Sequence, residues 1–391
     1  MSDIRVDIRN VYKIFGSHPE EVLPLLKSGE TKDRIHTKLN HVVALQDVSL
    51  SVRAGAIYMV MGLSGSGKST LARCINRLIE PSAGQIFIDG ENVLAADEHR
   101  LRELRRTRIS MVFQHFALLP NKTVIENVEF GLKLRGLAPK LRRQKAEEVL
   151  AVVGLTSWVH HRPETLSGGM RQRVGLARAL ATDADILIMD EPFSALDPLI
   201  RSEMQDELMR LQLLLQKTIL FITHDFQEAL KLGTRIAIMQ GGMIVREGAP
   251  QEVVLEPGTD YVAAFVRDID RSRLFDAASV MKPASGFGPD ADLATVRHTE
   301  IDPIFIVDQD KRVVGVVPAG ATVGTAASLM TRNFVSVRST DKLYKIADEF
   351  QANRPVAVVD DAGILIGSID PFQVLSRIGA PNRLSKSSAT G

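Results

Sequence analysis

The sequence predicts an α/β protein whose parallel core is followed by a smaller α+β unit. In the first part of the chain, wholly apolar strands alternate with helical segments, as in a parallel sheet that helices cover on both faces. The strands are "AIYMVM", "ADILIMD" and "TILFIT", and the helical segments lie near 69–79, 140–153 and 170–182. After about residue 270 a short unit occurs twice, so that "IFIVDQDKRVVGVV" matches "VAVVDDAGILIGSI".

The first domain is expected over residues 1–268. It begins with residues 3–15, whose alternating polar and apolar side chains are typical of an edge strand. A polar insertion with short helical patches follows at about 17–41, and we expect a helical subdomain at about 115–180. The chain has 391 residues, which is enough for two or three domains of about 100–200 residues each.

The second domain is expected over residues 269–391. Its repeats lie at about 276–325 and 326–380, and each is a pair of short strands joined by a polar turn and flanked by helices. The last residues, "RLSKSSATG", are expected to be disordered.

The composition narrows the class of protein. Lysine and arginine total 48 against 47 acidic residues, so the net charge gives no sign of a nucleic-acid partner. The single cysteine, Cys74, cannot form an internal disulfide and is most simply a small buried residue, which fits a reducing cytoplasm. We expect neither a signal peptide nor a membrane span, because no run approaches about 18 apolar residues. A role at a membrane would therefore need another subunit that crosses it.

The basic stretch "HRLRELRRTR" at 99–108 is interpreted as a solvated helix with internal ion pairs. Leu101, Glu103 and Leu104 are interleaved with its arginines, as on the surface of an amphipathic helix. Contact with anionic lipid is the alternative.

A glycine-rich loop follows the apolar strand "AIYMVM" and precedes a helical run. Its sequence, "GLSGSGKS", fits the pattern G-x-x-x-x-G-K-[ST], in which backbone N–H groups converge on phosphate oxygens. Lys68 is suited to bridge the β- and γ-phosphates of ATP, and the Ser69 hydroxyl to bind Mg²⁺. A glycine turn with an incidental lysine is the alternative. The candidate nucleotide-binding residues are Gly62, Ser64, Gly65, Ser66, Gly67, Lys68, Ser69 and Thr70.

Two carboxylates end the buried strand of "ILIMDE". Asp190 is expected to hold Mg²⁺, directly or through water, and Glu191 to orient or deprotonate an attacking water. Otherwise the two residues are only the solvated end of a strand.

A second serine and glycine cluster, "LSGGMRQR", lies about a hundred residues after the first. Ser167 is expected to cap a helix that begins near Met170, with Gly168 and Gly169 giving a tight entry. The start of such a helix is itself an anion site, yet the chain's own nucleotide already has a cradle. A second copy of the chain would supply the phosphate.

These residues resemble the ATP-binding subunits of ABC transporters, whose signature is LSGGQ and whose two ATP molecules lie between two such domains. Met170 stands where the usual signature has glutamine. The resemblance implies that Ser167, Gly168 and Gly169 bind the nucleotide of the partner, with Ser167 and Gly169 at the γ-phosphate. It also implies an ABC-type ATPase domain with a helical subdomain.

Other positions match the same family in order. Phe15 resembles the aromatic residue that stacks on adenine, with Tyr12 as a substitute and a strand-core phenylalanine as the plain alternative. Gln114 resembles the glutamine that touches Mg²⁺ and the attacking water, while its loop contacts the membrane subunit; a strand-end glutamine is the alternative. Asp197 resembles the aspartate of the loop that communicates with the opposite site, and His224 the histidine that senses the γ-phosphate.

The resemblance implies a cycle of dimer closure and opening. ATP closes two protomers face to face, and Glu191 activates water for in-line attack. Lys68, His224 and Mg²⁺ then stabilise the charge on the transferred phosphoryl group. Loss of the γ-phosphate opens the dimer, which a coupled membrane protein can use.

Several stretches narrow the resemblance to the ATPases of quaternary-amine importers for glycine betaine, proline betaine and choline. They include "MGLSGSGKSTLARCINRLIEPSAGQI", "MVFQHFALLPNKTVIENV" and "FSALDPLIRSEMQDEL". The resemblance implies a homodimer on the cytoplasmic face of the bacterial inner membrane, working with a permease and, through it, a substrate-binding protein. An importer of histidine or proline, a non-transport ABC ATPase and a sensor with weak turnover are the alternatives.

The repeated tail resembles a tandem pair of CBS modules, which implies regulation by ionic strength or by a nucleotide. The usual nucleotide-binding copy ends G-x-x-[ST]-x-x-D, with its carboxylate on the ribose. Here "GSIDPFQ" places Asp370 and Gln373 at the last two marked positions, and "GVVPAGA" lacks both. An ordinary adenosine site is therefore not expected, and a dimerising tail without a ligand is the alternative.

Overall fold

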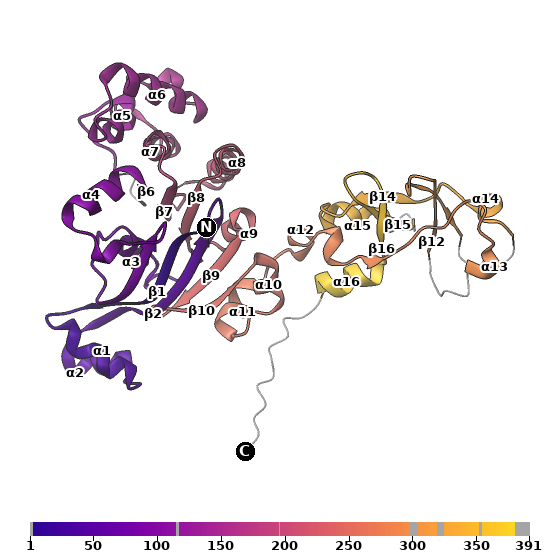
Figure 1. Ribbon diagram of the computed structural model, residues 1–391, viewed down its shortest axis with the longest axis horizontal. Coiled ribbons are helices and arrows are strands. Elements are labelled where there is room, and N and C mark those ends of the chain that lie inside the picture. Colours follow the sequence, from indigo (N-terminus) through magenta and orange to yellow (C-terminus); the bar gives the residue numbers. More distant parts are fainter. Residues whose placement is uncertain are drawn as a thin grey trace. The chain divides into compact units, whose positions relative to one another are not determined.

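The computed structural model describes residues 3–114, 117–194, 196–296, 303–318, 324–351 and 354–379. The chain divides into two compact units, residues 1–265 and 266–391 (Figure 1). The final residues that the sequence suggests are disordered lie outside the described residues. Among the described helices, none is long and apolar enough to cross a membrane.

A six-stranded sheet forms the centre of the first unit, as the apolar strands predict. Its order is β10-β9-β3-β8-β7-β6, and all neighbours are parallel except the pair of β9 and β10. The parallel α/β core is thus confirmed. The strands are β3 (Ile57–Met61), β6 (Ile109–Val112), β7 (Ile186–Asp190), β8 (Thr218–Thr223), β9 (Arg235–Gln240) and β10 (Met243–Gly248).

A second, antiparallel sheet of the order β2-β1-β4-β5 shares a buried core with the first. Its strands are β1 (Ile4–Phe15), β2 (Val42–Arg53), β4 (Ala83–Ile88) and β5 (Glu91–Asn92). The prediction of an edge strand over residues 3–15 was wrong, because β1 pairs with β2 on one side and with β4 on the other. Its alternating side chains mark one buried face, and not a free edge.

Helices surround the two sheets of the first unit. They are α3 (Lys68–Ile75), α4 (Glu98–Thr107), α8 (Pro198–Leu215), α9 (Phe226–Leu232), α10 (Pro250–Leu255) and α11 (Asp260–Val266). In α4, Leu101 and Leu104 are buried, whereas Arg100 pairs with Glu91 and Glu103. A short 3₁₀ turn, Val93–Ala95, precedes α4.

The helical subdomain has its own apolar core. It consists of α5 (Val124–Leu134), α6 (Pro139–Val152) and α7 (Gly168–Ala181), with 3₁₀ turns at Thr156–Trp158 and Pro163–Thr165. Thr123 and Glu126 form a reciprocal capping box at the start of α5. The insertion after β1 forms two further helices, α1 (Pro19–Lys27) and α2 (Lys32–Leu39).

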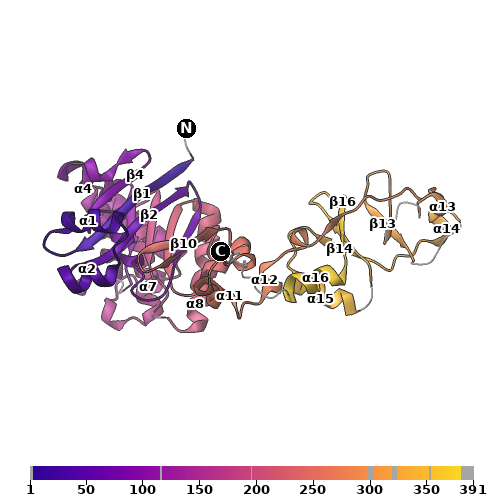
Figure 2. The ribbon, with the colours of Figure 1, turned by 90° about the horizontal axis from the view of Figure 1, so that it is seen from below.

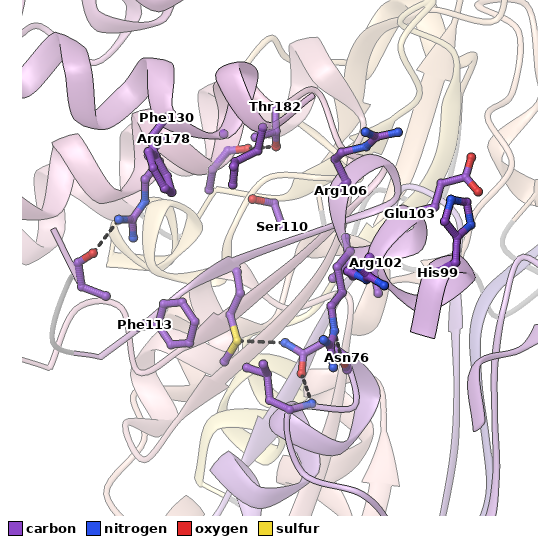
Figure 3. Close-up of a pocket in the computed structure, with 18 residues that line it drawn as sticks. Asn76, His99, Arg102, Glu103, Arg106, Ser110, Phe113, Phe130, Arg178 and Thr182 are labelled. Carbon is purple, nitrogen blue, oxygen red and sulfur yellow. Dashed lines mark hydrogen bonds between the residues drawn. The ribbon is translucent and has the colours of Figure 1, made fainter. Parts of the chain in front are cut away.

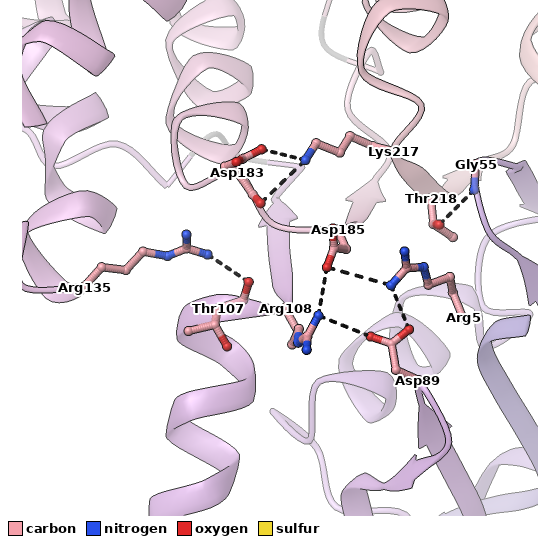
Figure 4. Close-up of polar contacts among 10 residues, drawn as sticks. All are labelled: Arg5, Gly55, Asp89, Thr107, Arg108, Arg135, Asp183, Asp185, Lys217 and Thr218. Atoms are coloured by element: carbon pink, nitrogen blue, oxygen red, sulfur yellow. Dashed lines mark hydrogen bonds and ion pairs between the residues drawn. The ribbon is translucent and has the colours of Figure 1, made fainter. Parts of the chain in front are cut away.

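Paired charges join the amino ends of β6 and β7 to the antiparallel sheet (Figure 4). Arg5 lies 2.9 Å from Asp89, and Arg108 lies 3.0 Å from Asp185. The two crossed pairs, Arg5 with Asp185 and Arg108 with Asp89, are each 3.8 Å apart. This square of charges connects the antiparallel sheet to the start of β6 and β7.

The second unit, at the right of Figure 2, contains two antiparallel hairpins that correspond to the two sequence repeats. The hairpins β12-β13 and β15-β16 share an apolar cluster, and β11 and β14 flank β16 and β15. The elements are α12 (Arg271–Leu274), a 3₁₀ turn (Ala277–Ser279), β11 (Lys282–Pro283), α13 (Leu293–Val296), β12 (Ile304–Val307), β13 (Val313–Val317), α14 (Ala326–Leu329), β14 (Val335–Arg338), α15 (Leu343–Gln351), β15 (Val356–Val359), β16 (Leu365–Ile369) and α16 (Pro371–Gly379).

Candidate nucleotide-binding site

The loop between β3 and α3 requires glycine at several positions. Gly65 and Gly67 have φ angles of 78° and 99°, in the left-handed region that favours glycine. A Cβ atom on Gly62 would lie 2.2 Å from the Met239 carbonyl oxygen, and one on Gly67 would lie 2.6 Å from that of Ala44. The backbone of the loop is therefore packed closely against its neighbours and presents the start of α3.

Lys68 is the first residue of α3, and its side chain is buried. Its ammonium donates hydrogen bonds of 2.9 Å to the carbonyl oxygens of both Gly62 and Leu63. Burial lowers the pKa of Lys68, and the nearby carboxylates of Glu191 and Asp190 oppose that shift. A buried cation therefore lies beside the free N–H groups at the start of a helix, which is an arrangement suited to an anion.

Ser69 and Asp190 lie in contact, although they come from α3 and the end of β7. The Ser69 hydroxyl donates a 2.7 Å hydrogen bond to the Asp190 carboxylate, which is almost wholly buried. Burial raises the pKa of Asp190, while the hydrogen bond from Ser69 opposes that shift. No group of three or more histidine, cysteine, aspartate or glutamate side chains is placed to hold a metal ion among the described residues. One carboxylate and one hydroxyl fit Mg²⁺, which takes oxygen ligands and draws others from water and phosphates.

Glu191, Gln114 and His224 meet at the carboxyl edge of the same sheet. One oxygen of Glu191 accepts a 3.3 Å hydrogen bond from the Gln114 amide and lies 3.2 Å from His224 Nδ1. Glu191 has a φ angle of 47°, which is rare for a residue with a side chain. Its N–H donates to the Ile222 carbonyl at 3.0 Å. The strained backbone at Glu191 thus holds its carboxylate between an amide and an imidazole.

The signature serine caps α7, as the sequence suggests. Ser167 Oγ accepts a hydrogen bond of 3.3 Å from the Met170 N–H. A Cβ atom on Gly169 would lie 2.7 Å from Ile200 Cγ2, so this helix start lies against the start of α8. Asp197 caps α8 by accepting from the N–H groups of Leu199 and Ile200. Within the described residues, no hydrogen bond joins the signature or Asp197 to the phosphate loop of the same chain.

Phe15 and Tyr12 differ in their surroundings. The Phe15 ring is 41% exposed, and the Lys13 ammonium lies 4.8 Å from its centroid. Tyr12 packs against the apolar cluster of the insertion, and burial raises the pKa of its hydroxyl. Phe15 is therefore the more accessible of the two rings.

Tyr261 is a residue of the site that our reading of the sequence missed. Its hydroxyl accepts a 3.1 Å hydrogen bond from the Leu63 N–H and donates one of 3.2 Å to the Met239 carbonyl. It thereby ties the phosphate loop to the end of β9. No motif marks "GTDYVAAFV", so only the fold reveals this contact.

A groove of about 720 Å³ lies between α4 and the helical subdomain, and Phe113, the residue before Gln114, is part of its lining (Figure 3). Figure 3 shows His99, Arg102 and Arg106 on one side of the groove, and Phe113, Phe130 and Arg178 on the other. The lining therefore combines apolar rings with an excess of positive charge.

In the second unit, the side chains of Asp370 and Gln373 form hydrogen bonds with the backbone at the start of α16. The Asp370 carboxylate accepts a 2.7 Å hydrogen bond from the Phe372 N–H, and Gln373 accepts one of 3.1 Å from the Asp370 N–H. Both side chains are thus used in capping the helix.

Two family models match the chain. The model of ABC transporters matches residues 45–194, and the model of the CBS domain matches residues 326–380. The second match covers the second repeat of the tail.

Curated relatives match almost the whole chain. The glycine betaine/proline betaine transport system ATP-binding protein ProV of Salmonella typhimurium is 43% identical over 97% of this chain and 99% of its own length. The glycine betaine transport ATP-binding protein OpuAA of Bacillus subtilis is 44% identical over 94% of this chain and 92% of its own length.

A solved structure resembles the first unit. It is a dimer of MJ0796, a bacterial ABC transporter cassette, with a TM-score of 0.53 and 33% sequence identity. The match covers 63% of this chain and 98% of the chain in that structure. A second structure of the same cassette shows a dimeric post-hydrolysis state bound to ADP and Pi, with a TM-score of 0.54 and 33% identity, covering 63% of this chain and 98% of its own.

Proposed function

The chain belongs to the ATP-binding subunits of ABC transporters, and from that premise we propose that it powers the uptake of glycine betaine, proline betaine or a related quaternary amine. The relatives that match over almost their whole length are named for glycine betaine transport. The substrate class rests on that likeness. The position on the cytoplasmic face of the bacterial inner membrane is proposed on the same ground.

The observation that carries the ATPase chemistry is the meeting of Glu191, Gln114 and His224. In this proposal Glu191 accepts the proton of an attacking water, and its contacts with Gln114 and His224 support that role. Ser69 and Asp190 would hold Mg²⁺, which neutralises phosphate charge when it is bound.

Nucleotide recognition is shared between the phosphate loop and Phe15. Lys68 exchanges the carbonyl oxygens of Gly62 and Leu63 for the β- and γ-phosphates. The exposed ring of Phe15 stacks on adenine, a role that Tyr12 cannot take while it packs against the insertion.

Two copies of the chain complete each site. The signature residues Ser167, Gly168 and Gly169 of one copy face the γ-phosphate held by the other, and Asp197 lies next to them. The support is that the start of α7 contacts the start of α8 but makes no hydrogen bond to its own phosphate loop among the described residues. A homodimer follows, as in the dimeric cassette that resembles the first unit.

The permease is proposed to contact the groove between α4 and the helical subdomain, and the substrate-binding protein to act only through the permease. Charge reversal in Arg102→Glu should then abolish uptake and leave the ATPase activity of the isolated subunit within about twofold. Lys140→Glu is the matched control, because Lys140 is exposed on the helical subdomain outside the groove. Equal uptake in both variants would contradict this docking site. No nucleic-acid partner is proposed, since the charges balance.

Regulation by the second unit is proposed to respond to ionic strength more than to an adenosine ligand. Gln373 stands at the usual ribose-binding position and Asp370 at the [ST] position, and both side chains are engaged in capping α16. A tail that only dimerises would leave uptake insensitive to salt.

Complementation tests the proposal as a whole. A strain that lacks this protein is given either the full chain or a chain ending near residue 270, and uptake of labelled glycine betaine, proline betaine, choline, histidine and proline is measured at low and raised salt. Betaine or choline uptake with both chains, salt-dependent only with the full chain, is expected. Restoration of histidine or proline uptake alone would overturn the proposed substrate class.

A further inference from the structure

The insertion between β1 and β2 is a packed element with its own core. Val22, Leu26 and Ile35 from its two helices are buried together with Ile14 and Val43 of the flanking strands. Figure 1 shows α1 and α2 at the end of these strands. Nothing in the proposed ATPase chemistry uses this element.

Both ends of the insertion are fixed by a buried histidine, His41. Its Nε2 accepts a 3.3 Å hydrogen bond from the His18 N–H, and its Nδ1 lies 2.5 Å from the Leu39 carbonyl. A Cβ atom on Gly16 would lie 2.0 Å from this imidazole, so the chain enters the insertion by passing directly against it. The insertion therefore has a fixed position on the antiparallel sheet.

From the first turn of α2, Lys32 reaches the turn between β9 and β10. Its ammonium donates a hydrogen bond to the Gly241 carbonyl. Gly241 and Gly242 have φ angles of 54° and 79°, and a Cβ atom on Gly242 would lie 2.4 Å from the Ala44 carbonyl oxygen. The turn is thus a closely packed two-glycine element between the insertion and the phosphate loop.

The next contact leads into the phosphate loop. The Gly242 N–H donates a 3.0 Å hydrogen bond to the Ser66 carbonyl. The Gly241 carbonyl and the Gly242 N–H belong to one planar peptide group, and they point in opposite directions. The Ser66 carbonyl and the Gly67 N–H belong to another. Gly67 is the N-cap of α3, so its N–H is one of the donors that have no partner within the helix.

These contacts form a chain of two peptide groups between a cation and the phosphate cradle. Hydrogen bonds in such a chain polarise one another, so a positive charge on the first carbonyl strengthens the last N–H donor. We propose that Lys32 is a positioning residue of the nucleotide site, which orients and polarises the Gly67 N–H through these two peptides and so raises the affinity for the phosphates of ATP. The inference rests on the proposed binding of ATP by this loop.

The test compares three substitutions in the full-length protein. Lys32→Met removes the charge and keeps most of the apolar stem, and Lys32→Arg retains a cation. Lys38→Met changes an exposed lysine on the same helix. ATP affinity is measured by calorimetry with Mg²⁺, and KM, kcat and Tm are measured in parallel.

Lys32→Met should weaken ATP binding and raise KM about three- to tenfold, with kcat within about twofold and Tm unchanged. Lys32→Arg should restore most of the affinity, and Lys38→Met should behave as the wild type. An unchanged affinity in Lys32→Met, an equal loss in Lys38→Met, or a fall in Tm and kcat that arginine does not reverse would each overturn the inference. A wild-type protein that binds no ATP would instead overturn the proposed function.

Discussion

Charged side chains are arranged differently at the two ends of the strands of the six-stranded sheet, which we call its amino edge and its carboxyl edge. At the amino edge, Arg5 and Arg108 face Asp89 and Asp185, so two cations meet two anions. Lys217 and Asp183 form a further pair at 2.7 Å (Figure 4). Charge at this edge is neutralised within the protein.

At the carboxyl edge, Asp190 and Glu191 contact neutral or titratable groups. Asp190 accepts from a serine, and Glu191 contacts a glutamine amide and the His224 imidazole. Among the described residues, no lysine or arginine forms an ion pair with either carboxylate, and Lys68 donates instead to two carbonyl groups.

The difference indicates which edge is built for a charged ligand. Exposed ion pairs at the amino edge contribute little free energy each, but they leave no charge to be balanced. The carboxyl edge holds a buried aspartate, a partly buried glutamate and a buried lysine that form no ion pair with one another, so phosphates and a metal ion would complete it. Substitutions at the two edges should therefore have effects of very different size.

The largest effect is expected for Glu191→Gln. Removing the carboxylate that accepts the proton of water should lower ATP turnover by about 10²- to 10⁴-fold, because general-base catalysis contributes that much. ATP binding should persist, so the variant should form a stable ATP-dependent dimer. Phosphate release and light scattering measure the two properties. Turnover near that of the wild type would contradict the role of Glu191.

Asp190→Asn should weaken Mg²⁺-dependent ATP binding about tenfold or more, since a neutral amide is a poorer ligand for Mg²⁺. Because burial raises the pKa of Asp190, the wild type should lose Mg²⁺ binding, as the pH falls, at a higher pH than an exposed aspartate would. With its raised pKa, Asp190 binds a proton more readily in the folded state than in the unfolded state. Its protonation therefore increases the free energy of unfolding as the pH falls, and this group does not cause acid unfolding. Titration of Mg²⁺ at several pH values should show no such dependence in Asp190→Asn.

Ser167→Ala separates the cap of α7 from the proposed contact across the dimer. Loss of the cap should cost about 1 kcal/mol of stability. Thr123→Ala, at the capping box of α5, should cost about the same. Only Ser167→Ala should also weaken ATP-dependent dimerisation in a Glu191→Gln background, measured by light scattering. Equal dimerisation in both variants would count against the shared site.

The smallest effect is expected for Arg108→Ala at the amino edge. Breaking half-exposed ion pairs should lower the free energy of unfolding by no more than about 1 kcal/mol. The kcat should stay within about twofold, because Arg108 lies at the opposite end of the strands from Glu191. Urea unfolding and an ATPase assay measure both. A large loss of turnover in Arg108→Ala would contradict the expected difference between the two edges.

Short-range patterns in the sequence were sufficient to predict most of the strands in the core. Apolar runs such as "ADILIMD" predicted the buried parallel strands, and the loop before Lys68 predicted a strand, a tight turn and a helix. The alternation in residues 3–15 misled us about the position of β1, because one buried face looks the same in an inner and in an edge strand. Tyr261 and Lys32 had no local signal at all.

The sequence by itself determined the helices and strands and the polar side chains at their ends, because local hydrogen bonding and the periodicity of apolar residues act over a few residues. Only the tertiary structure decided which groups meet. Ser69 and Asp190 are 121 positions apart, and Lys32 and Gly241 are 209 apart. The first pair forms because parallel strands bring their carboxyl ends to one edge of the sheet, and the second because the insertion packs on the antiparallel sheet beside the turn that follows β9.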